Sequence, residues 1–242
     1  MISSLSIVVP AYNEAVRLPA TLEKIIAYLR SRRIEFHEIL VVDDGSSDET
    51  AAVAERLAES HPHLRVLKNP GNRGKGYSVR HGMLQAKGEW VLFTDADLSA
   101  PIEELDRLAA AVIREKAQAA IGSRGMDSSM IGVHQPGFRE AAGRFFNLVM
   151  RTLTGLPFKD TQCGFKLFDR DAVERIFSRQ LLERFGFDVE VLFIARVQGI
   201  RVVEVPVRWD HVEGSKVGLL SGLNGFVDIW RVLRNHWAGR YR

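Results

Sequence analysis

The sequence of 242 residues contains a single cysteine, Cys163, and no apolar run long enough to cross a membrane. With one cysteine the chain cannot form an intrachain disulfide, so a reducing compartment is expected. A membrane-spanning helix needs roughly 18 or more consecutive apolar residues, and we therefore expect no span. Residues 1–14 lack a basic stretch before their short apolar run, which predicts a first β-strand there and not a signal peptide.

The chain also lacks a strong charge of either sign. Lysine and arginine number 33 against 30 aspartate and glutamate, and the net charge of +3 is too small to indicate a nucleic-acid partner. Apolar residues make up 46% and charged residues 26%, which is typical of an ordinary globular protein. No internal repeat, low-complexity tract or clear linker interrupts the sequence, so we expect one domain with a sizeable core.

Short apolar runs alternate with segments of helical spacing along the first half of the chain. Such alternation indicates βαβ units and a mostly parallel central sheet flanked by helices, which is an α/β fold. The strands are expected at residues 5–9, 38–42, 64–67, 90–94 and 119–122, and the helices at 18–30, 48–60, 76–86 and 102–114. The second half is less regular, with helices expected at 139–153 and 189–198, strands at 165–168 and 201–207, and a long loop at 123–140.

The tail, residues 221–242, places its apolar side chains on one helical face beside several arginines. We expect it to form a basic amphipathic helix that follows a main domain of residues 1–220. Two interpretations stay open at this point. Either the apolar face packs back onto the domain, or the aromatic and basic side chains together contact anionic lipid headgroups.

Two carboxylates one residue apart, Asp95 and Asp97, follow the apolar strand predicted at 90–94. Like charges this close repel, and their desolvation is costly unless a cation compensates them. Mg²⁺ and Mn²⁺ prefer oxygen ligands, often one or two carboxylates together with substrate phosphates. We therefore expect one of these metals at Asp95 and Asp97, with one carboxylate on the metal and the other on a sugar or ribose.

Polar motifs follow two further predicted strands. Residues 10–14 read Pro-Ala-Tyr-Asn-Glu after the first strand, and residues 43–48 read Asp-Asp-Gly-Ser-Ser-Asp after the second. In an open α/β sheet, ligands bind outside the carboxyl ends of the strands. Each motif alone is weak, because a pair of aspartates occurs by chance and Asp48 suits a helix cap. Three acidic motifs at three strand ends together indicate a site for a nucleotide diphosphate.

Four segments resemble, in this order, the start of the inverting family 2 glycosyltransferases with a GT-A fold: VVPAYNE, VVDDGSSDET, NRGKGYSVRHGM and FTDADLS. Three later segments, DTQCGFKLFDRDA, VEVPVRW and EGSK, resemble the polyprenyl-phosphate sugar synthases of that family. DTQCGFKLF and EGSK are most similar to the dolichyl-phosphate β-glucosyltransferase branch, whereas DADLS is closer to the mannose synthase form. The resemblance covers nearly the whole chain and implies a single-domain GT-A fold.

The resemblance also implies a nucleotide-sugar pocket. The residues that would line it are Pro10, Tyr12, Glu14, Asp43 or Asp44, and Asp95. An aromatic ring suits the face of a base, and carboxylates accept from its N–H groups. Lys75 lies in a glycine-rich loop just before a predicted helix, which suits contact with the diphosphate or the ribose.

By the same resemblance, Arg124 and Arg139 would hold the phosphate of the acceptor. Guanidinium groups suit phosphate because their planar fork makes paired hydrogen bonds. Lys216 would approach a phosphate from a loop, and Arg208 would assist it.

Asp188 has three interpretations. In family members that glycosylate hydroxyls, an acidic residue in this region is the general base, because a hydroxyl must lose its proton as it attacks. A phosphate monoester needs no base, since its second pKa is about 6 by analogy with phosphoserine. Asp188 would then orient a basic residue or the acceptor, or simply cap the helix predicted at 189–198.

We therefore expect a metal-dependent transferase that moves a hexose from a UDP-sugar to a polyprenyl or dolichyl phosphate. Glucose is the preferred candidate for that hexose. The alternatives are a GDP-mannose donor, or a hydroxyl acceptor with Asp188 as base. More distant ones are a nucleotidyltransferase and a regulatory nucleotide-sugar-binding module without turnover. Because such acceptors reside in membranes, we expect a cytoplasmic protein that is peripheral at the cytoplasmic membrane face. Whether a membrane-protein partner anchors it stays open.

Overall fold

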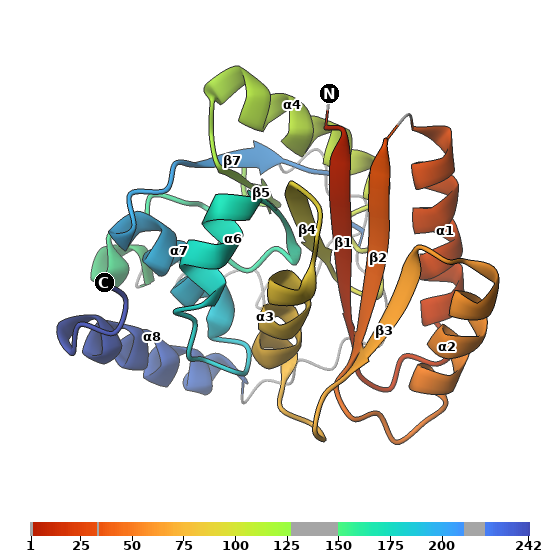
Figure 1. Ribbon diagram of the computed structural model, residues 1–242. Coiled ribbons are helices and arrows are strands. Elements are labelled where there is room, and N and C mark those ends of the chain that lie inside the picture. Colours follow the sequence, from red (N-terminus) through yellow and green to blue (C-terminus); the bar gives the residue numbers. More distant parts are fainter. Residues whose placement is uncertain (1, 33, 127–149, 211–220) are drawn as a thin grey trace.

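The computed structural model describes residues 2–32, 34–126, 150–210 and 221–242 (Figure 1). Two of the predicted phosphate-binding residues, Arg139 and Lys216, lie outside the described residues. The same holds for most of the loop expected at 123–140 and most of the helix expected at 139–153.

A seven-stranded sheet forms the centre of the molecule, in the order β3-β2-β1-β4-β6-β5-β7. The strands are β1 (Ser4–Ala11), β2 (Phe36–Asp43), β3 (Leu64–Lys68), β4 (Trp90–Thr94), β5 (Ala119–Ser123), β6 (Phe165–Asp169) and β7 (Val202–Pro206). All pairs are parallel except those of β6, which runs antiparallel to β4 and to β5. The sheet is therefore mostly parallel, as predicted.

Helices cover both faces of this sheet (Figure 1). They are α1 (Leu18–Ser31), α2 (Thr50–Ser60), α3 (Lys75–Gln85), α4 (Leu105–Glu115), α6 (Arg170–Phe177), α7 (Phe187–Val197) and α8 (Ser221–Trp237), and the 3-10 turn η1 (Ile102–Glu104) precedes α4. Successive side chains of a strand point to opposite faces. In β1, accordingly, Ile7 belongs to the hydrophobic cluster that includes residues of α1, α2 and α4, whereas Val8 belongs to the cluster that includes residues of α3, α6 and α7.

The strands and helices predicted for the first half are confirmed, with small shifts at their ends. One helix, α6, was not predicted at all, because its eight residues are short for a periodic pattern. Its start is nevertheless marked in the sequence, since the Asp169 side chain accepts a hydrogen bond from the backbone N–H of Ala172 as a helix cap. The sequence also gave no sign that β6 runs antiparallel.

The strand order positions the functional site. β1 lies between β2 and β4. After β1 the chain adds β2 and β3 on one side of it, and then crosses to add β4 on the other side. Ligands of open α/β sheets bind at such a reversal, outside the carboxyl ends of the strands. The motifs at residues 10–14, 43–48 and 95–97 therefore share one edge of the sheet.

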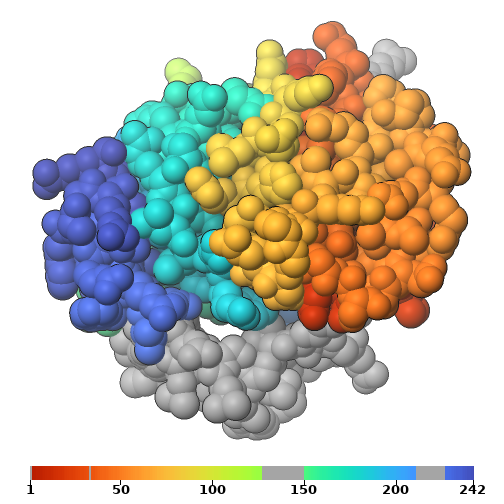
Figure 2. Space-filling view, turned by 60° about the horizontal axis from the view of Figure 1, so that its bottom comes forward, coloured from red at the N-terminus to blue at the C-terminus, as the bar shows by residue number. Residues whose placement is uncertain are grey.

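The tail forms α8, and some of its side chains pack against the domain while others are exposed. Ile229, Val232 and Tyr241 are buried in the core, whereas the side chains of Trp230 and Trp237 are 55% and 72% exposed. Figure 2 shows α8 at one edge of the molecule, beside the segment that includes α6 and α7. Among the described residues, no helix is long and apolar enough to cross a membrane.

Candidate active site

The two carboxylates that follow β4 have different surroundings. Lys75 Nζ lies 2.6 Å from Asp95 Oδ1, and both side chains are partly exposed. The cation beside Asp95 is thus a lysine at the start of α3, and the metal expected here stays a prediction. Burial alone would lower the pKa of Lys75, but the negative charges of Asp95 and Asp188 outweigh this effect and raise it. Lys75 is accordingly positively charged at neutral pH.

Asp97 is oriented by a backbone N–H two residues further along the chain. Its Oδ1 accepts a hydrogen bond of 3.0 Å from the N–H of Ser99, and the intervening Leu98 has a φ of 47°. The described residues contain no group of three or more His, Cys, Asp and Glu that could hold a metal. The donor set still fits Mg²⁺ or Mn²⁺, since such an ion is commonly held by one or two carboxylates, substrate phosphates and water. Asp97 would hold it, with Asp95 beside it.

A small pocket lies against Asp95. Its lining residues come from three separate segments and are Thr94, Asp95, Ser99, Ala100, Cys163, Gly164 and Trp209. Gly164 is required for close approach, because a Cβ built there would lie 2.1 Å from Asp95 Oδ2. Burial raises the pKa of the Cys163 thiol to about 12, so this cysteine is a packed thiol and not a thiolate nucleophile.

The ends of β1 and β2 are joined by hydrogen bonds across the site. Asn13, whose φ is 54°, accepts a 2.8 Å hydrogen bond from the N–H of Ser47, and its own N–H donates to the hydroxyl of Ser46. Pro10 lies within β1 opposite Val42. These contacts bring the predicted motifs at 10–14 and 43–48 together and leave the Tyr12 ring partly exposed beside them.

Asp43 and Asp44 are both buried but have different roles in the structure. Asp44 accepts hydrogen bonds from the backbone N–H groups of Arg73 and Gly74 and from the Asn69 side chain, at 2.7–3.0 Å. It thus shapes the glycine-rich loop that leads to Lys75. Within the described part of the chain, the Asp43 carboxylate accepts only long contacts of 3.4 Å from the N–H of Ser46. Asp43 is therefore the better placed of the two to accept from a base.

Two further predicted residues already have ionic partners. The Glu14 carboxylate pairs with Arg17 at 2.8 Å and 3.0 Å, one helical turn away. Arg208 is exposed and lies 3.8 Å from Asp210, whose N–H donates to the carbonyl of Ser99. That backbone contact brings the segment after β7 next to the Asp97 turn.

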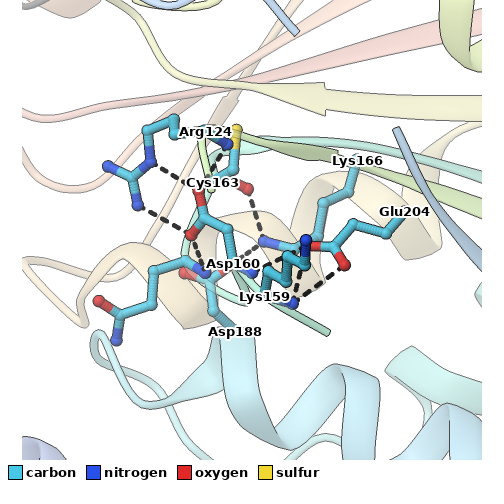
Figure 3. A network of polar contacts seen from close by, with 8 residues as sticks. Arg124, Lys159, Asp160, Cys163, Lys166, Asp188 and Glu204 are labelled. Carbon is cyan, nitrogen blue, oxygen red and sulfur yellow. Dashed lines mark hydrogen bonds and ion pairs between the residues drawn. The ribbon is translucent and has the colours of Figure 1, made fainter. Parts of the chain in front are cut away.

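Arg124 forms an ion pair at the rim of the site, which Figure 3 shows. Its Nε and Nη2 donate to the two oxygens of Asp160 at 2.7 Å and 2.9 Å, and its backbone N–H donates to the same carboxylate. The guanidinium carbon lies 5.3 Å from the centre of the Trp209 ring. The Arg124 side chain keeps 31% of its surface exposed. Arg124 thus lies beside the pocket that Trp209 lines.

Asp188 belongs to a second ion pair, below the site. It bonds to the ammonium of Lys166, which also donates to the carbonyl of Cys163 at 2.6 Å. The Lys166 side chain is 0% exposed, and Asp188 as a residue is 4% exposed. Burial raises the pKa of Asp188 despite the positive charges of Lys166 and Lys75. The helix cap of α7 is Gly186, so the interpretation of Asp188 as that cap is wrong.

Sequence reasoning missed two members of this arrangement, Asp160 and Lys166. Both lie inside the segment DTQCGFKLF, but neither was singled out as a site residue. Lys166 did carry a signal: a lysine between Phe165 and Leu167 in an apolar strand is almost never fully buried unless paired. The partner could not be read from the sequence, because Asp188 lies 22 residues further along the chain.

Comparisons with known proteins give a consistent picture. The model of the family described as Glycosyl transferase family 2 matches residues 6–177. A dolichyl-phosphate beta-glucosyltransferase from Trichomonas vaginalis is 38% identical over 94% of this chain and 72% of its own length. Proteins of the same name from Dictyostelium discoideum and Homo sapiens are 38% and 36% identical over 98% of this chain, which spans 76% and 77% of their lengths.

Solved structures share the fold at low sequence identity. Mannosyl-3-phosphoglycerate synthase from Rubrobacter xylanophilus has a TM-score of 0.68 at 18% identity, over 98% of this chain and 75% of that one. Glucosyl-3-phosphoglycerate synthase from Mycobacterium tuberculosis, in a complex with Mn²⁺, UDP and product, has a TM-score of 0.67 at 18% identity, over 95% and 80%. At this identity, the likeness establishes the fold alone.

Proposed function

This chain belongs to glycosyl transferase family 2 and is a glycosyltransferase, and on that premise we propose that it transfers glucose from UDP-glucose to the phosphate of a dolichyl or other polyprenyl phosphate. The names of its curated relatives support both the glucosyl group and the dolichyl phosphate acceptor. A GDP-mannose donor is the second candidate, because the segment FTDADLS resembles the mannose synthase form.

One observation supports a phosphate acceptor in preference to a hydroxyl acceptor. The acidic residue in the region of the family's base, Asp188, is buried and paired with Lys166, whereas Arg124 at the rim is partly exposed. A general base must come within about 3 Å of the proton that it removes, and a buried, paired carboxylate is poorly placed for that. Among the described residues, a partly exposed arginine beside a buried and paired Asp188 suits an acceptor that is already an anion.

The proposed reaction then needs no proton transfer. A phosphate monoester with a second pKa near 6 is largely dianionic at neutral pH. One of its oxygens forms a bond to the anomeric carbon while the bond from that carbon to the UDP oxygen breaks, with inversion. A bound divalent metal would stabilise the negative charge of the departing diphosphate.

We assign the donor side to the residues at the ends of β1, β2 and β4. Tyr12 would cover the base and Asp43 would accept from it, with Pro10 and Glu14 shaping the pocket. Lys75, which is paired with Asp95 but partly exposed, is placed to bind a diphosphate or ribose oxygen. Asp97 would hold the metal.

We assign the acceptor side to the arginines. Arg124 would bind the phosphate, and Arg139, Arg208 and Lys216 are proposed from the resemblance to add positive charge there. Substituting Arg208→Ala tests this set with a described residue. It should raise the KM for the lipid phosphate and leave the KM for the donor unchanged, and an unchanged acceptor KM would remove Arg208 from the set.

A membrane-resident acceptor requires that the protein reach the lipid surface, which we propose to be the cytoplasmic face. The outer face of α8 supports this, since Trp230 and Trp237 are exposed and Arg234 lies 5.3 Å from the Trp230 ring. Co-sedimentation with anionic vesicles should fall in a Trp230→Ala/Trp237→Ala variant. Equal binding of the variant would exclude α8, and attachment to native membranes without binding to protein-free vesicles would point to a membrane-protein partner.

The function is tested by nucleotide release and product analysis. UDP-glucose and GDP-mannose are each supplied with Mg²⁺ or Mn²⁺, with and without a polyprenyl phosphate in detergent. We expect UDP release only with the lipid phosphate present, together with a β-linked glucosyl lipid, and loss of turnover when EDTA removes the metal. GDP release would move the donor to mannose, and no lipid-stimulated release from either donor would contradict the proposal.

A further inference from the structure

Arg124 is held more tightly than an exposed arginine usually is. Three N–H groups of this one residue donate to the Asp160 carboxylate, and they belong to Nε, Nη2 and the backbone. The paired geometry fixes the plane of the guanidinium and its rotation, because both carboxylate oxygens are used. Burial alone would raise the pKa of Asp160, but the charge of Arg124 outweighs it and holds that pKa below its usual value.

Asp160 occupies only one edge of the Arg124 guanidinium, and the N–H donors of another edge are available to a ligand. A guanidinium has five N–H donors, and Asp160 takes those of the edge formed by Nε and Nη2. In Figure 3 the remaining terminal nitrogen, Nη1, points away from Asp160. The edge formed by Nη1 and Nη2 therefore keeps donors that match two oxygens of a phosphate.

The flat face of the same group is also supported. The Trp209 ring lies 5.3 Å from the guanidinium carbon, within the range of a cation–π contact. The segment around Trp209 is itself anchored, because the N–H of Val207 donates to the carbonyl of Ser123 and that of Asp210 to the carbonyl of Ser99. Trp209 also lines the pocket beside Asp95.

Asp160 is in turn fixed by its surroundings. Its backbone N–H donates to Glu204 at 2.8 Å, and that of Lys159 donates to the same carboxylate, so β7 anchors this turn. The N–H of Gln162 donates to Asp160 Oδ1 at 3.1 Å. The Asp160 side chain is only 9% exposed. Contacts within the protein therefore hold Asp160 in place.

We propose that Asp160 is the positioning residue for the acceptor phosphate, holding Arg124 so that its Nη1 and Nη2 edge meets the phosphate oxygens. This inference rests on the proposed function. A carboxylate beside a phosphate site also lowers the local positive charge, which by itself weakens anion binding. Asp160 therefore improves acceptor binding only if the orientation of Arg124 outweighs that charge effect, and the two contributions act in opposite directions on the affinity.

The test compares Asp160→Asn with Asp171→Asn, a matched control whose carboxylate forms an exposed pair with Arg175 on α6. The asparagine in Asp160→Asn keeps one acceptor oxygen and the size of the side chain but loses the ion pair. We expect the KM for a polyprenyl phosphate to rise about tenfold, equal to ~1.4 kcal/mol, with the KM for UDP-glucose unchanged. The control should change neither constant.

Two results would overturn the inference. An acceptor KM that stays unchanged or falls would mean that orientation does not outweigh charge. Equal increases for donor and acceptor, together with a lower melting temperature, would mean that Asp160 only supports the fold.

A binding measurement separates this inference from the proposed function. A water-soluble short-chain prenyl phosphate is titrated calorimetrically into the wild type, Asp160→Asn and Arg124→Ala, without donor. Tight binding by the wild type, about tenfold weaker binding by Asp160→Asn and none by Arg124→Ala would support the inference even if no sugar were transferred. Absence of binding by the wild type, or equal binding by all three, would overturn it.

Discussion

The site contains two kinds of ion pair that differ in burial. Lys166 and Asp188, the floor pair, lie between sheet and helix with 0% and 5% of their side chains exposed. The rim pairs, Arg124 with Asp160 and Lys75 with Asp95, each keep part of their cation exposed. In a buried pair each charged group contacts its partner in place of water, so separating the two groups costs a large free energy. A rim cation still has free donors, so the rim pairs can bind substrate whereas the floor pair can only support them.

The floor pair also links the two rim pairs electrostatically. Asp188 raises the pKa of Lys75, and the charge of Lys166 helps to lower the pKa of Asp160. Charges of opposite sign thus alternate from Asp95 through Lys75 and Asp188 to Lys166. The arrangement keeps both rim cations charged. This difference between floor and rim predicts that breaking the floor pair lowers stability, whereas breaking a rim pair lowers activity.

The largest effect is expected when the floor pair is broken. Lys166→Met leaves the buried Asp188 carboxylate unpaired, and removal of one partner of such a pair typically costs about 3–5 kcal/mol of unfolding free energy. Urea denaturation measures this loss. The double variant Lys166→Met/Asp188→Asn should recover much of it, because no unpaired charge remains.

Lys68→Met, which breaks an exposed pair with Glu55, is the matched control and should change stability little. If Lys166→Met proved as mild as Lys68→Met, the distinction between floor and rim would be wrong.

A smaller effect, on activity and not on folding, is expected at the rim. Gly164→Ala would place a Cβ 2.1 Å from Asp95 Oδ2 and so displace the carboxylate from Lys75. We expect kcat/KM for UDP-glucose to fall about tenfold or more, which is ~1.4 kcal/mol. In the matched variant Gly125→Ala the nearest atom, Lys159 Cβ, is 3.5 Å away. Equal rates for the two variants would show that the position of Asp95 is not critical.

The smallest effect is expected in how the stability contributions of a rim carboxylate, Asp160, and the floor carboxylate, Asp188, depend on pH. The folded pKa of Asp160 is lowered, so its contribution to stability is present above the unfolded value and is lost as the pH falls through the folded one. The folded pKa of Asp188 is raised, mainly by burial, so its contribution declines as the pH rises from the unfolded value toward the folded one.

Urea unfolding of the wild type, Asp160→Asn and Asp188→Asn between pH ~3.5 and pH ~7 would measure this difference. The destabilisation caused by Asp160→Asn should grow with rising pH, and that caused by Asp188→Asn should shrink. A trend of the same sign in both variants would show that the two carboxylates do not differ as described.

The sequence predicted much of the fold and the location of the site. Apolar runs and helical spacing identified the strands and helices of the first half, and Asp95 and Asp97 marked the carboxyl end of β4. The repulsion between these two residues predicted a divalent metal, which stays a prediction. The ion pair between Lys75 and Asp95 was not foreseen, since nothing in the spacing of these two residues indicates that they meet.

The remaining features depend on contacts between distant segments. Lys166 lies on β6, which runs antiparallel to β4 and β5, and its buried charge is compensated by Asp188 from α7. The partner of Arg124 is likewise 36 residues away in the chain, at Asp160. Family resemblance could suggest that Arg124 binds a phosphate, but not which side of its guanidinium is already occupied.

The most direct test of this account compares two acceptors that differ only in the phosphate. Initial rates of transfer from UDP-glucose are measured with a polyprenyl phosphate and with the polyprenol of the same length, for the wild type and Asp188→Asn. The account predicts transfer to the phosphate at least ~100-fold faster than to the alcohol, since a missing general base costs roughly that factor or more. Equally fast transfer to the polyprenol, abolished in Asp188→Asn, would contradict it and make Asp188 the base.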